Sequence, residues 1–322
     1  MHAIRQYEFG PAENLRYEQV ADPVPGAGQV RIAVEASGVH LIDTVIRRGV
    51  QLGPNPLPQL PMTPGREVAG VVDSVGAGAE FWSGRRVVAH LGQASGGYAE
   101  RALAPSGALH EIPDGMPADV AVAMIGTGRT AVGILEIADL TPDDVVLVTA
   151  AAGGLGTLFM QAAAGLGATA VGLAGGPAKI ERVRALGAAL AVDYLQPGWP
   201  DRVREALPDR RPTIALDGVG GRVAQSVADL LDDGGRLVRF GWSSGETAPV
   251  DTAGRGITVV NGLRARPGER PGALRDREAA ALANAAEGVW TPLVQRFALA
   301  RAGTAHTAME TRATVGKTVL VP

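Results

Sequence analysis

The chain has 322 residues, a formal net charge of −3 and no cysteine. The length suits two domains, the charge gives no electrostatic case for a nucleic-acid partner or a membrane surface, and the missing cysteines exclude disulfides and thiolate metal sites. No apolar run reaches the ~18 residues of a membrane helix, and the N-terminus lacks the basic and apolar regions of a signal peptide, so we expect a cytoplasmic protein.

The first third of the chain is predicted to be rich in β-strands. Residues 30–36 alternate apolar and polar side chains, which is the period of a half-buried strand. Residues 66–78 and 85–92 have the composition of further strands that end in glycine turns. Residues 49–65 are rich in proline and are expected to form an extended loop beside a pocket.

From about Gly126 onward, strand-like and helical runs alternate. Strand-like runs begin near residues 145, 169, 213, 235 and 257, and helical runs begin near residues 157, 177 and 221. This order implies an α/β fold, with a parallel sheet covered by helices on both faces. A further helix is predicted over residues 277–288.

Residues 151–156 read Ala-Ala-Gly-Gly-Leu-Gly, which is G-x-G-x-x-G with alanine at its first position. The segment follows a predicted strand and opens a predicted helix, as the dinucleotide-binding fingerprint requires. Small residues let the backbone approach a pyrophosphate, and a helix N-terminus offers free N–H groups and the positive end of its dipole. We therefore expect cofactor contacts at Ala152, Gly153, Gly154, Leu155 and Gly156; the alternative is a tight turn that needs small residues.

The end of the next predicted strand favours NADPH over NADH. An NAD site usually has an acidic residue there, which binds the ribose 2′-OH. Here the strand ends in Gly175 and Gly176 without an acid, and Lys179 follows. Lys179 and Lys317 are the two lysines of a chain whose other Lys+Arg residues are arginine. A cation beside a roomy strand end suits a 2′-phosphate; the alternative is a solvated lysine in the first turn of a helix.

Several segments of the chain carry motifs that are specific in combination. They are residues 148–188, "GVHLIDTVIRRG" (38–49), "GGYAE" (96–100), "DGVG" (217–220), "RLVRFGWSSG" (236–245) and "METRATVGKTVLVP" (309–322). Together they make the chain resemble the zinc-independent quinone oxidoreductases of the medium-chain dehydrogenase/reductase superfamily. The resemblance implies a GroES-like catalytic domain of residues 1–123 and 266–322 and a Rossmann domain of residues 124–265, with the active site in the cleft.

The resemblance also implies cofactor contacts. Lys179, Tyr194 and Arg312 match the residues that hold the 2′-phosphate in the family, which strengthens the expectation of NADPH; Tyr194 could instead be a packed aromatic residue and Arg312 a solvated one. Thr130 matches a threonine near the nicotinamide, and its alternative is the first turn of a helix. Two further strand ends are expected to face the nucleotide crevice, unless they serve turn geometry only: Asp217, Gly218, Val219, Phe240, Gly241 and Ser243.

No metal is expected. Zinc-dependent alcohol dehydrogenases of the superfamily carry G-H-E where this chain has Gly65, Arg66 and Glu67. A catalytic zinc needs three Cys, His or carboxylate ligands, and the chain has five scattered histidines and no cysteine. Hydride transfer from NADPH to a quinone or an α,β-unsaturated carbonyl stays feasible without a Lewis acid, and this is the expected reaction.

The predicted catalytic residues are His40, Asp43 and Thr130. His40 stands where relatives usually have asparagine, and it could bond a substrate carbonyl or a cofactor ribose and deliver a proton; the alternative is a turn histidine bonded to the backbone. Asp43 matches the family aspartate and is expected to orient a neighbour. Relatives often have tyrosines near Val45 and Gln51, so this pocket is expected to be less aromatic.

Two other functions stay open. An enoyl-thioester reductase would need a basic patch, which Arg264, Arg266 and Arg270 could supply unless they lie in a solvated loop. A non-catalytic NADPH-binding protein, structural or regulatory, is the other. We also expect a homodimer, because the apolar strand within residues 256–263 could be a sheet edge that a second copy covers.

Overall fold

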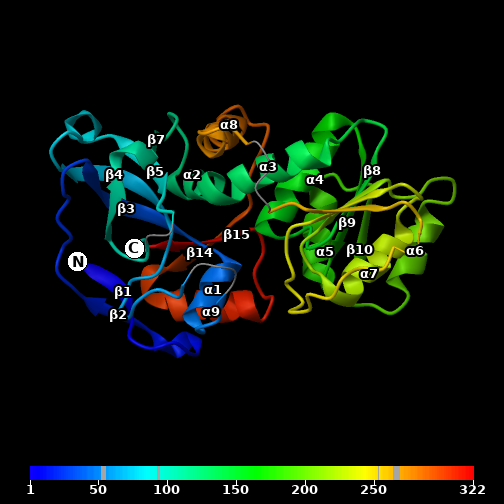
Figure 1. The fold of residues 1–322 in the computed structure, drawn as a ribbon, viewed down its shortest axis with the longest axis horizontal. Coiled ribbons are helices and arrows are strands. Elements are labelled where there is room, and N and C mark those ends of the chain that lie inside the picture. The colour runs from blue at the N-terminus through cyan, green and yellow to red at the C-terminus, as the bar shows by residue number, and fades with distance from the viewer. Residues whose placement is uncertain (52–55, 93–94, 253, 264–268) are drawn as a thin grey trace. The chain divides into compact units, whose positions relative to one another are not determined.

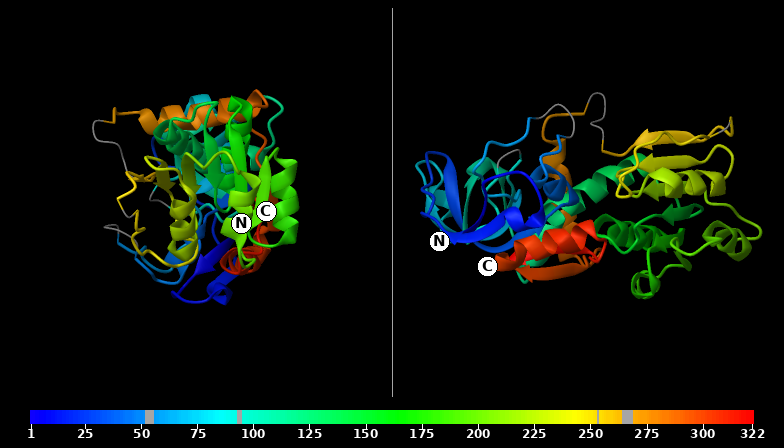
Figure 2. Two further views of the ribbon diagram at one scale, coloured as in Figure 1. Left: turned by 90° about the vertical axis from the view of Figure 1, so that its right-hand side faces the viewer. Right: turned by 90° about the horizontal axis from the view of Figure 1, so that it is seen from below.

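The computed structural model describes residues 1–51, 56–92, 95–252, 254–263 and 269–322. This described part separates into two compact units. The first joins residues 1–127, 281–286 and 292–322, and the second holds residues 128–280 and 287–291. The blue N-terminal and red C-terminal segments accordingly share the first unit (Figures 1 and 2). These bounds describe compactness, and the domain boundaries expected from the sequence stay a prediction.

The first unit is built on a mainly antiparallel sheet. In the described residues its order is β14 (Val294–Ala298), β15 (Lys317–Val321), β3 (Gln29–Val39), β4 (Glu67–Val75), β5 (Arg86–His90) and β7 (Leu109–Glu111), and β6 (Arg101–Pro105) also pairs with β3. Burial alternates along the first half of β3, as the sequence predicts. Because β15 pairs with β3, the C-terminal strand that begins at Lys317 lies beside the end of the strand that precedes His40.

A β-hairpin and the helices α1 (Leu41–Arg47) and α9 (Ala302–Glu310) also belong to this unit. Strands β1 (His2–Gln6) and β2 (Leu15–Gln19) pair with each other. Helix α1 follows β3, and α9 packs against it. The Asp43 carboxylate accepts the backbone N–H of His40 at 2.8 Å, which caps the start of α1. Single 3₁₀ turns lie at Ala12–Asn14, Glu80–Trp82, Ser106–Ala108 and Leu299–Arg301.

The second unit is a parallel sheet with the order β10 (Leu190–Asp193), β9 (Thr169–Ala174), β8 (Val145–Val148), β11 (Ile214–Asp217), β12 (Arg236–Arg239) and β13 (Thr258–Asn261). The connecting helices are α4 (Gly154–Leu166), α5 (Pro177–Ala185), α6 (Trp199–Ala206) and α7 (Gly221–Leu230). Strands β8 and β11 are buried along their whole length, so they read as continuous apolar runs. The strand order reverses between β8 and β11, which makes this a Rossmann-type sheet and confirms the expected α/β class.

One long helical segment, Ala118–Ala138, is strongly apolar. It runs through α2 (Ala118–Ala123), a π-helical turn (Met124–Gly128) and α3 (Arg129–Ala138). Among the described residues it is the one helix that could cross a membrane by length and composition, which the sequence analysis did not anticipate. However, 56% of its apolar window is buried inside the protein, and a core helix passes the same test. The remaining helix, α8, spans Ala273–Ala286.

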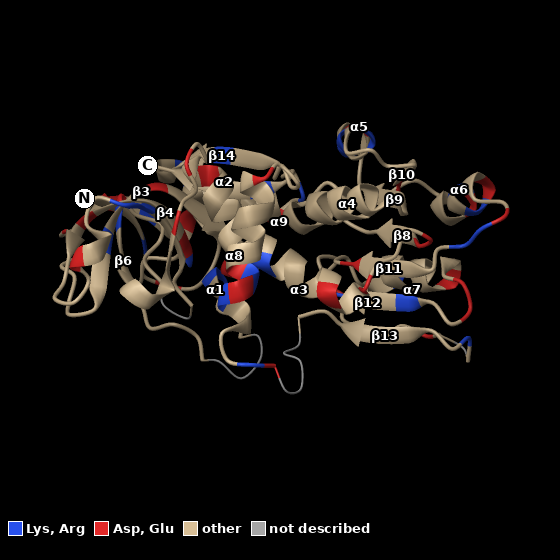
Figure 3. Cartoon of the chain, turned by 90° about the horizontal axis from the view of Figure 1, so that it is seen from above, with Lys and Arg blue, Asp and Glu red and all other residues tan. Residues whose placement is uncertain are grey.

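Charged side chains are interspersed along the described chain (Figure 3). Many of them pair at hydrogen-bond distance: Arg31 Nε lies 2.8 Å from Asp73, and Arg277 Nε lies 2.9 Å from Glu136. The N–O distances of these ion pairs can be compared with those of the charged groups near the site.

Candidate functional site

The turn between β8 and α4 has the tight geometry that the glycine pattern predicts. The Gly153 N–H donates to the Ala150 carbonyl at 2.8 Å, and Ala150 has a positive φ of 49°. A Cβ on Gly156 would lie 2.3 Å from the Ala150 oxygen, so a side chain there would clash with the backbone. Gly156 therefore lets α4 begin close against the strand end, where its free N–H groups can meet an anion.

The Asp217 side chain stabilises the neighbouring turn, which follows β11. Its carboxylate is fully buried and accepts the Thr149 hydroxyl at 2.8 Å and the N–H groups of Val219 and Gly220 at 3.0 and 3.1 Å. Burial raises the pKa of Asp217, although these hydrogen bonds act to lower it. Both oxygens are thus engaged within the protein, and a direct contact between Asp217 and the cofactor stays a prediction.

The other predicted strand-end residues pack closely together. A Cβ on Gly218 would lie 2.5 Å from the Phe240 ring, and one on Gly241 would lie 2.7 Å from the Gly218 oxygen. The Ser243 N–H donates to that same oxygen at 3.1 Å, and Val219 is buried. The two glycines therefore allow the ends of β11 and β12 to meet.

The corner expected to hold a 2′-phosphate lies at the ends of β9 and β10, which pair with Ala174 opposite Asp193. Gly175 follows β9, and a Cβ there would lie 3.6 Å from the Tyr194 ring. Lys179 lies in the first turn of α5, half-buried. The structure thus brings Gly175 and Tyr194 together, at the corner where α5 begins.

One acid at this corner escaped the sequence analysis. The Asp193 carboxylate accepts the Leu195 N–H at 2.9 Å. Burial alone would raise the pKa of Asp193, but hydrogen bonds from the Gly176 and Leu195 N–H groups outweigh it and lower that pKa. Asp193 ends β10, whereas the fingerprint places its acid at the end of the preceding strand, β9, so the fingerprint does not point to Asp193.

Two predicted residues occupy other places. Arg312 belongs to the first compact unit, directly after α9, with a positive φ of 60°. Thr130 lies in the first turn of α3 in the second unit, half-buried. The role of Arg312 toward the phosphate and of Thr130 toward the nicotinamide stay predictions.

His40 belongs to a tight charged triad in the first unit. Its Nε2 lies 2.5 Å from Glu67 Oε1 and 2.9 Å from Lys317 Nζ, and Lys317 Nζ donates to Glu67 Oε2 at 2.7 Å. Glu67 is fully buried and Lys317 nearly so, whereas 27% of the His40 side chain is exposed. Burial alone would raise the pKa of Glu67, but the charges of His40 and Lys317 outweigh it and hold that pKa well below its usual range.

Two glycines make room for the Glu67 carboxylate. A Cβ on Gly38 would lie 2.0 Å from one carboxylate oxygen, and a Cβ on Gly126 would lie 1.5 Å from the other. Sequence reasoning treated Glu67 as a remnant of the G-H-E motif and did not connect it with Lys317. The one hint in the sequence was that lysine is rare in this arginine-rich chain, which marked Lys317 as a residue worth examining.

Asp43 connects α1 with a second buried network. Besides the His40 N–H, the Asp43 carboxylate accepts the Tyr98 hydroxyl at 3.1 Å, and that hydroxyl lies 3.2 Å from His306 Nε2. Burial and the Asp43 charge raise the pKa of Tyr98 well above its ordinary value. Burial lowers the pKa of His306 to about 4, so His306 is neutral at pH 7. The orienting role expected of Asp43 is compatible with these contacts and stays a prediction.

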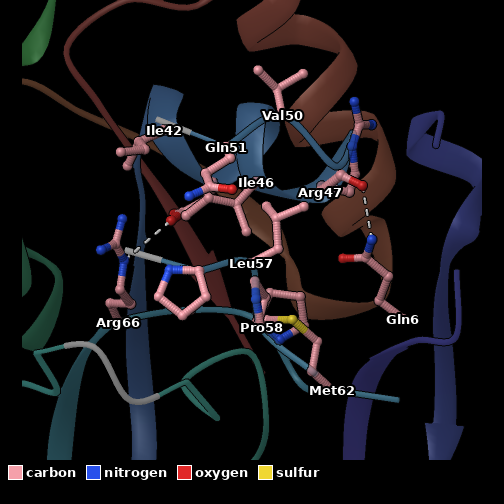
Figure 4. Close-up of a pocket in the computed structure, with 14 residues that line it drawn as sticks. Gln6, Ile42, Ile46, Arg47, Val50, Gln51, Leu57, Pro58, Met62 and Arg66 are labelled. Carbon is pink, nitrogen blue, oxygen red and sulfur yellow. Dashed lines mark hydrogen bonds and ion pairs between the residues drawn. The ribbon is translucent and has the colours of Figure 1, made fainter. Parts of the chain in front are cut away.

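A pocket of about 210 Å³ opens between α1 and the proline-rich loop. Figure 4 shows Arg66 at one end and Gln6 with Arg47 at the other, where Gln6 Nε2 donates to the Arg47 carbonyl at 2.8 Å. Apolar side chains form much of the wall: Ile42, Ile46, Val50, Leu57, Pro58 and Met62. Gln51 and Asp43 also line it, whereas Val45 does not contribute.

Arg66 occupies the place of a zinc ligand in the G-H-E motif. Its Nε lies 3.7 Å from Asp43 Oδ1. Within the described ranges, no three His, Asp or Glu side chains gather as metal ligands would. Of the loop arginines considered for a thioester, Arg264 and Arg266 lie outside the described residues, and Arg270 forms an ion pair with Asp276.

Comparison with known proteins shows which family has a similar sequence and fold. Residues 26–114 match the alcohol dehydrogenase GroES-like domain, and residues 154–275 match the zinc-binding dehydrogenase family model. A quinone oxidoreductase of Pseudomonas aeruginosa is 32% identical over 324 residues, covering 98% of this chain and 97% of that one. A 2-haloacrylate reductase of Burkholderia sp. is 30% identical over 100% of this chain and 99% of that one. The crystal structure of Escherichia coli quinone oxidoreductase complexed with NADPH superposes with a TM-score of 0.86, at 28% identity over all of both chains.

A GroES-like sheet with a Rossmann sheet defines a medium-chain dehydrogenase/reductase, as the motifs predicted. Within that superfamily the chain belongs to the quinone oxidoreductase family and is an oxidoreductase.

Proposed function

We propose that this chain is an NADPH-dependent reductase that works without a metal and reduces a quinone or an α,β-unsaturated carbonyl. Bound NADPH supplies the hydride. The protein orients the acceptor and meets the negative charge that develops on its carbonyl oxygen.

The cofactor choice is supported by the fit of two places in the second unit. The turn at Gly153 and Gly156 leaves the N-terminus of α4 open beside the end of β8, which suits a pyrophosphate. The corner of Gly175, Lys179 and Tyr194 offers a cation, a hydroxyl and a position without Cβ, which suits a 2′-phosphate. The NADPH complex of the E. coli relative supports the same choice.

The observation that carries the metal-free mechanism is the engaged carboxylate of Glu67. Lys317 and His40 approach its two oxygens at 2.7 and 2.5 Å in a buried setting. A zinc ion would have to displace these partners and tolerate Arg66 in place of a histidine. These contacts support a site that holds no zinc at Glu67.

His40 is the proposed proton donor to the reduced acceptor. Its ring is partly exposed, and the contact of Nε2 with the Glu67 carboxylate orients the ring. Asp43 positions His40 through its backbone N–H. A His40→Asn variant is expected to keep NADPH affinity and to lose about tenfold in kcat. An unchanged kcat would leave His40 with a structural role.

The proposal also includes a homodimer that pairs through β13. This strand forms one edge of the second sheet, and its Val259 is 45% exposed, with the nearby Leu263 at 52%. Exposed apolar edges favour pairing with another strand. Light scattering at micromolar concentration is expected to give twice the chain mass, and the Val259→Lys variant is expected to lower it; a monomeric wild type would remove this part of the proposal.

The test of the reaction is NADPH oxidation with 1,4-benzoquinone, 9,10-phenanthrenequinone and a small enone, with and without a chelator. We expect turnover that the chelator does not change. Loss of turnover on chelation, restored by zinc, would contradict the metal-free mechanism. Tight NADPH binding without turnover on any acceptor would instead favour the non-catalytic alternative.

A further inference from the structure

Arg66 differs from the paired arginines of this protein. Its guanidinium lines the pocket, and 19% of its side chain is exposed. Its ion pair with Asp43 spans 3.7 Å from Nε to Oδ1, which is longer than a hydrogen bond. In the described part of the chain, the Arg66 guanidinium thus makes no hydrogen bond, although it carries five N–H donors.

The partner of Arg66 is held by other groups. Asp43 Oδ2 accepts the His40 N–H at 2.8 Å and the Tyr98 hydroxyl at 3.1 Å. These bonds fix the carboxylate, which is 5% exposed, at the start of α1. Asp43 therefore cannot turn to satisfy Arg66 in a bidentate manner, and the donors of Arg66 remain available to a ligand in the pocket.

The rest of the pocket limits what the ligand can be. Asp43 and Gln51 are polar members of the lining near Arg66, and much of the remaining wall is apolar, with Ile42, Ile46 and Leu57 among its members (Figure 4). The volume of about 210 Å³ is below the 300–1,000 Å³ of pockets for drug-sized ligands. A small, mainly apolar molecule with one anionic planar end matches this shape, because a guanidinium pairs best with a carboxylate in a two-point geometry.

We propose that Arg66 binds the carboxylate of a small 2-alkenoate, so that this chain reduces alkenes conjugated to a carboxylate. The inference rests on the proposed function and names the acceptor class of the same site. One relative, at 30% identity, is named a 2-haloacrylate reductase, an enzyme for a substrate of this chemistry.

The chemistry explains why a cation is needed there. The hydride adds to the alkene carbon remote from the carboxylate, and the displaced π electrons move onto the carboxylate oxygens. The adjacent carbon then takes one proton and the electrons return from the carboxylate, so the alkenoate, one hydride and one proton give the saturated carboxylate. A carboxylate that already carries a charge is a poor hydride acceptor, and a guanidinium that bonds both oxygens stabilises the added charge.

The test compares 2-chloroacrylate with its neutral methyl ester, using NADPH and the variants Arg66→Met and Arg66→Lys. We expect wild type to favour the acid, and Arg66→Met to lose about 100-fold in kcat/KM on the acid with less than about threefold change on the ester. Arg66→Lys keeps the charge without the two-point geometry and should fall between them. Arg48→Met is the matched control, because Arg48 is 50% exposed and lies outside the pocket lining.

A binding measurement separates this inference from the proposed function. Calorimetry with 2-chloropropionate, in the presence of NADP⁺, should show binding to wild type and to Arg48→Met, and at least tenfold weaker binding to Arg66→Met. If no acceptor is reduced, the proposed function fails and the calorimetry alone decides about Arg66. Equal binding by all three proteins, or equal losses on acid and ester in Arg66→Met, overturns the inference.

Discussion

Two charged clusters of the first unit differ in how fully their donors and acceptors are engaged. In the triad of His40, Glu67 and Lys317, the lysine and the carboxylate meet at 2.7 Å in a buried site. In the pair of Arg66 and Asp43, the atoms stand 3.7 Å apart beside a pocket. A buried, engaged cluster stabilises the fold and orients a neighbour, whereas a cation with unengaged donors beside a cavity is ready for a ligand. Removing the charge of Lys317 should therefore lower the stability of the fold, whereas removing the charge of Arg66 should weaken ligand binding and leave the stability nearly unchanged.

The largest expected effect is on Lys317. The Lys317→Met variant leaves the buried Glu67 carboxylate without its lysine, and we expect the free energy of unfolding to fall by about 3–5 kcal/mol. Urea unfolding at pH 8 measures it. The double variant Lys317→Met/Glu67→Gln removes both charges and should lose less than the single one. A loss below 1 kcal/mol in the single variant would contradict the view that this cluster is structural.

The network behind Asp43 should show in the acid stability of the protein. Because the pKa of His306 is lowered from 6.5 to about 4 in the folded state, the unfolded state takes up the proton first. Its contribution to stability is complete above about pH 6.5 and is lost as the pH falls toward 4, by about 3 kcal/mol in all. The control is His306→Asn, which should lose less stability between pH 7 and 4; parallel pH curves for the two proteins would remove His306 as the cause.

Lys179 is expected to bind the cofactor phosphate, so replacing it should weaken binding without unfolding the protein. Lys179→Ala should weaken NADPH binding by about 10- to 100-fold and leave NADH binding and the thermal midpoint nearly unchanged. Fluorescence titration of both cofactors measures the split. Equal weakening for both would place Lys179 away from the 2′-phosphate.

The smallest expected effect is the stability of Arg66→Met. A loose ion pair near solvent contributes about 0–1 kcal/mol, so the free energy of unfolding should change by less than about 1 kcal/mol. The same urea experiment as for Lys317→Met gives the comparison within one series. A loss as large as that of Lys317→Met would make Arg66 a structural residue and would break the contrast between the two clusters.

The local features of this chain could be predicted from its sequence, because they depend on neighbours in the chain. The glycine turn before α4, the alternation that forms the parallel sheet and the glycines after β9 all follow from short patterns. The contact of Gly218 with Phe240 and the engagement of Asp217 by Thr149 depend on side-chain packing between strands, which no short pattern records.

The triad shows most clearly what the sequence could not reveal. His40, Glu67 and Lys317 come from three different segments, and β15 brings the last of them beside β3. Residue types pointed to Lys317 through its rarity, and to Glu67 through its motif, but not to their contact. Likewise, Arg66 was read as a lost zinc ligand, while its unengaged guanidinium becomes visible only with the pocket around it.

The most direct test of the contrast is a crystal structure with NADP⁺ and 2-chloropropionate. We expect both carboxylate oxygens within hydrogen-bond distance of the Arg66 guanidinium, with Lys317 still bound to Glu67. A carboxylate bound elsewhere, with Arg66 still facing Asp43, would contradict the assignment of Arg66 as the acceptor-binding cation.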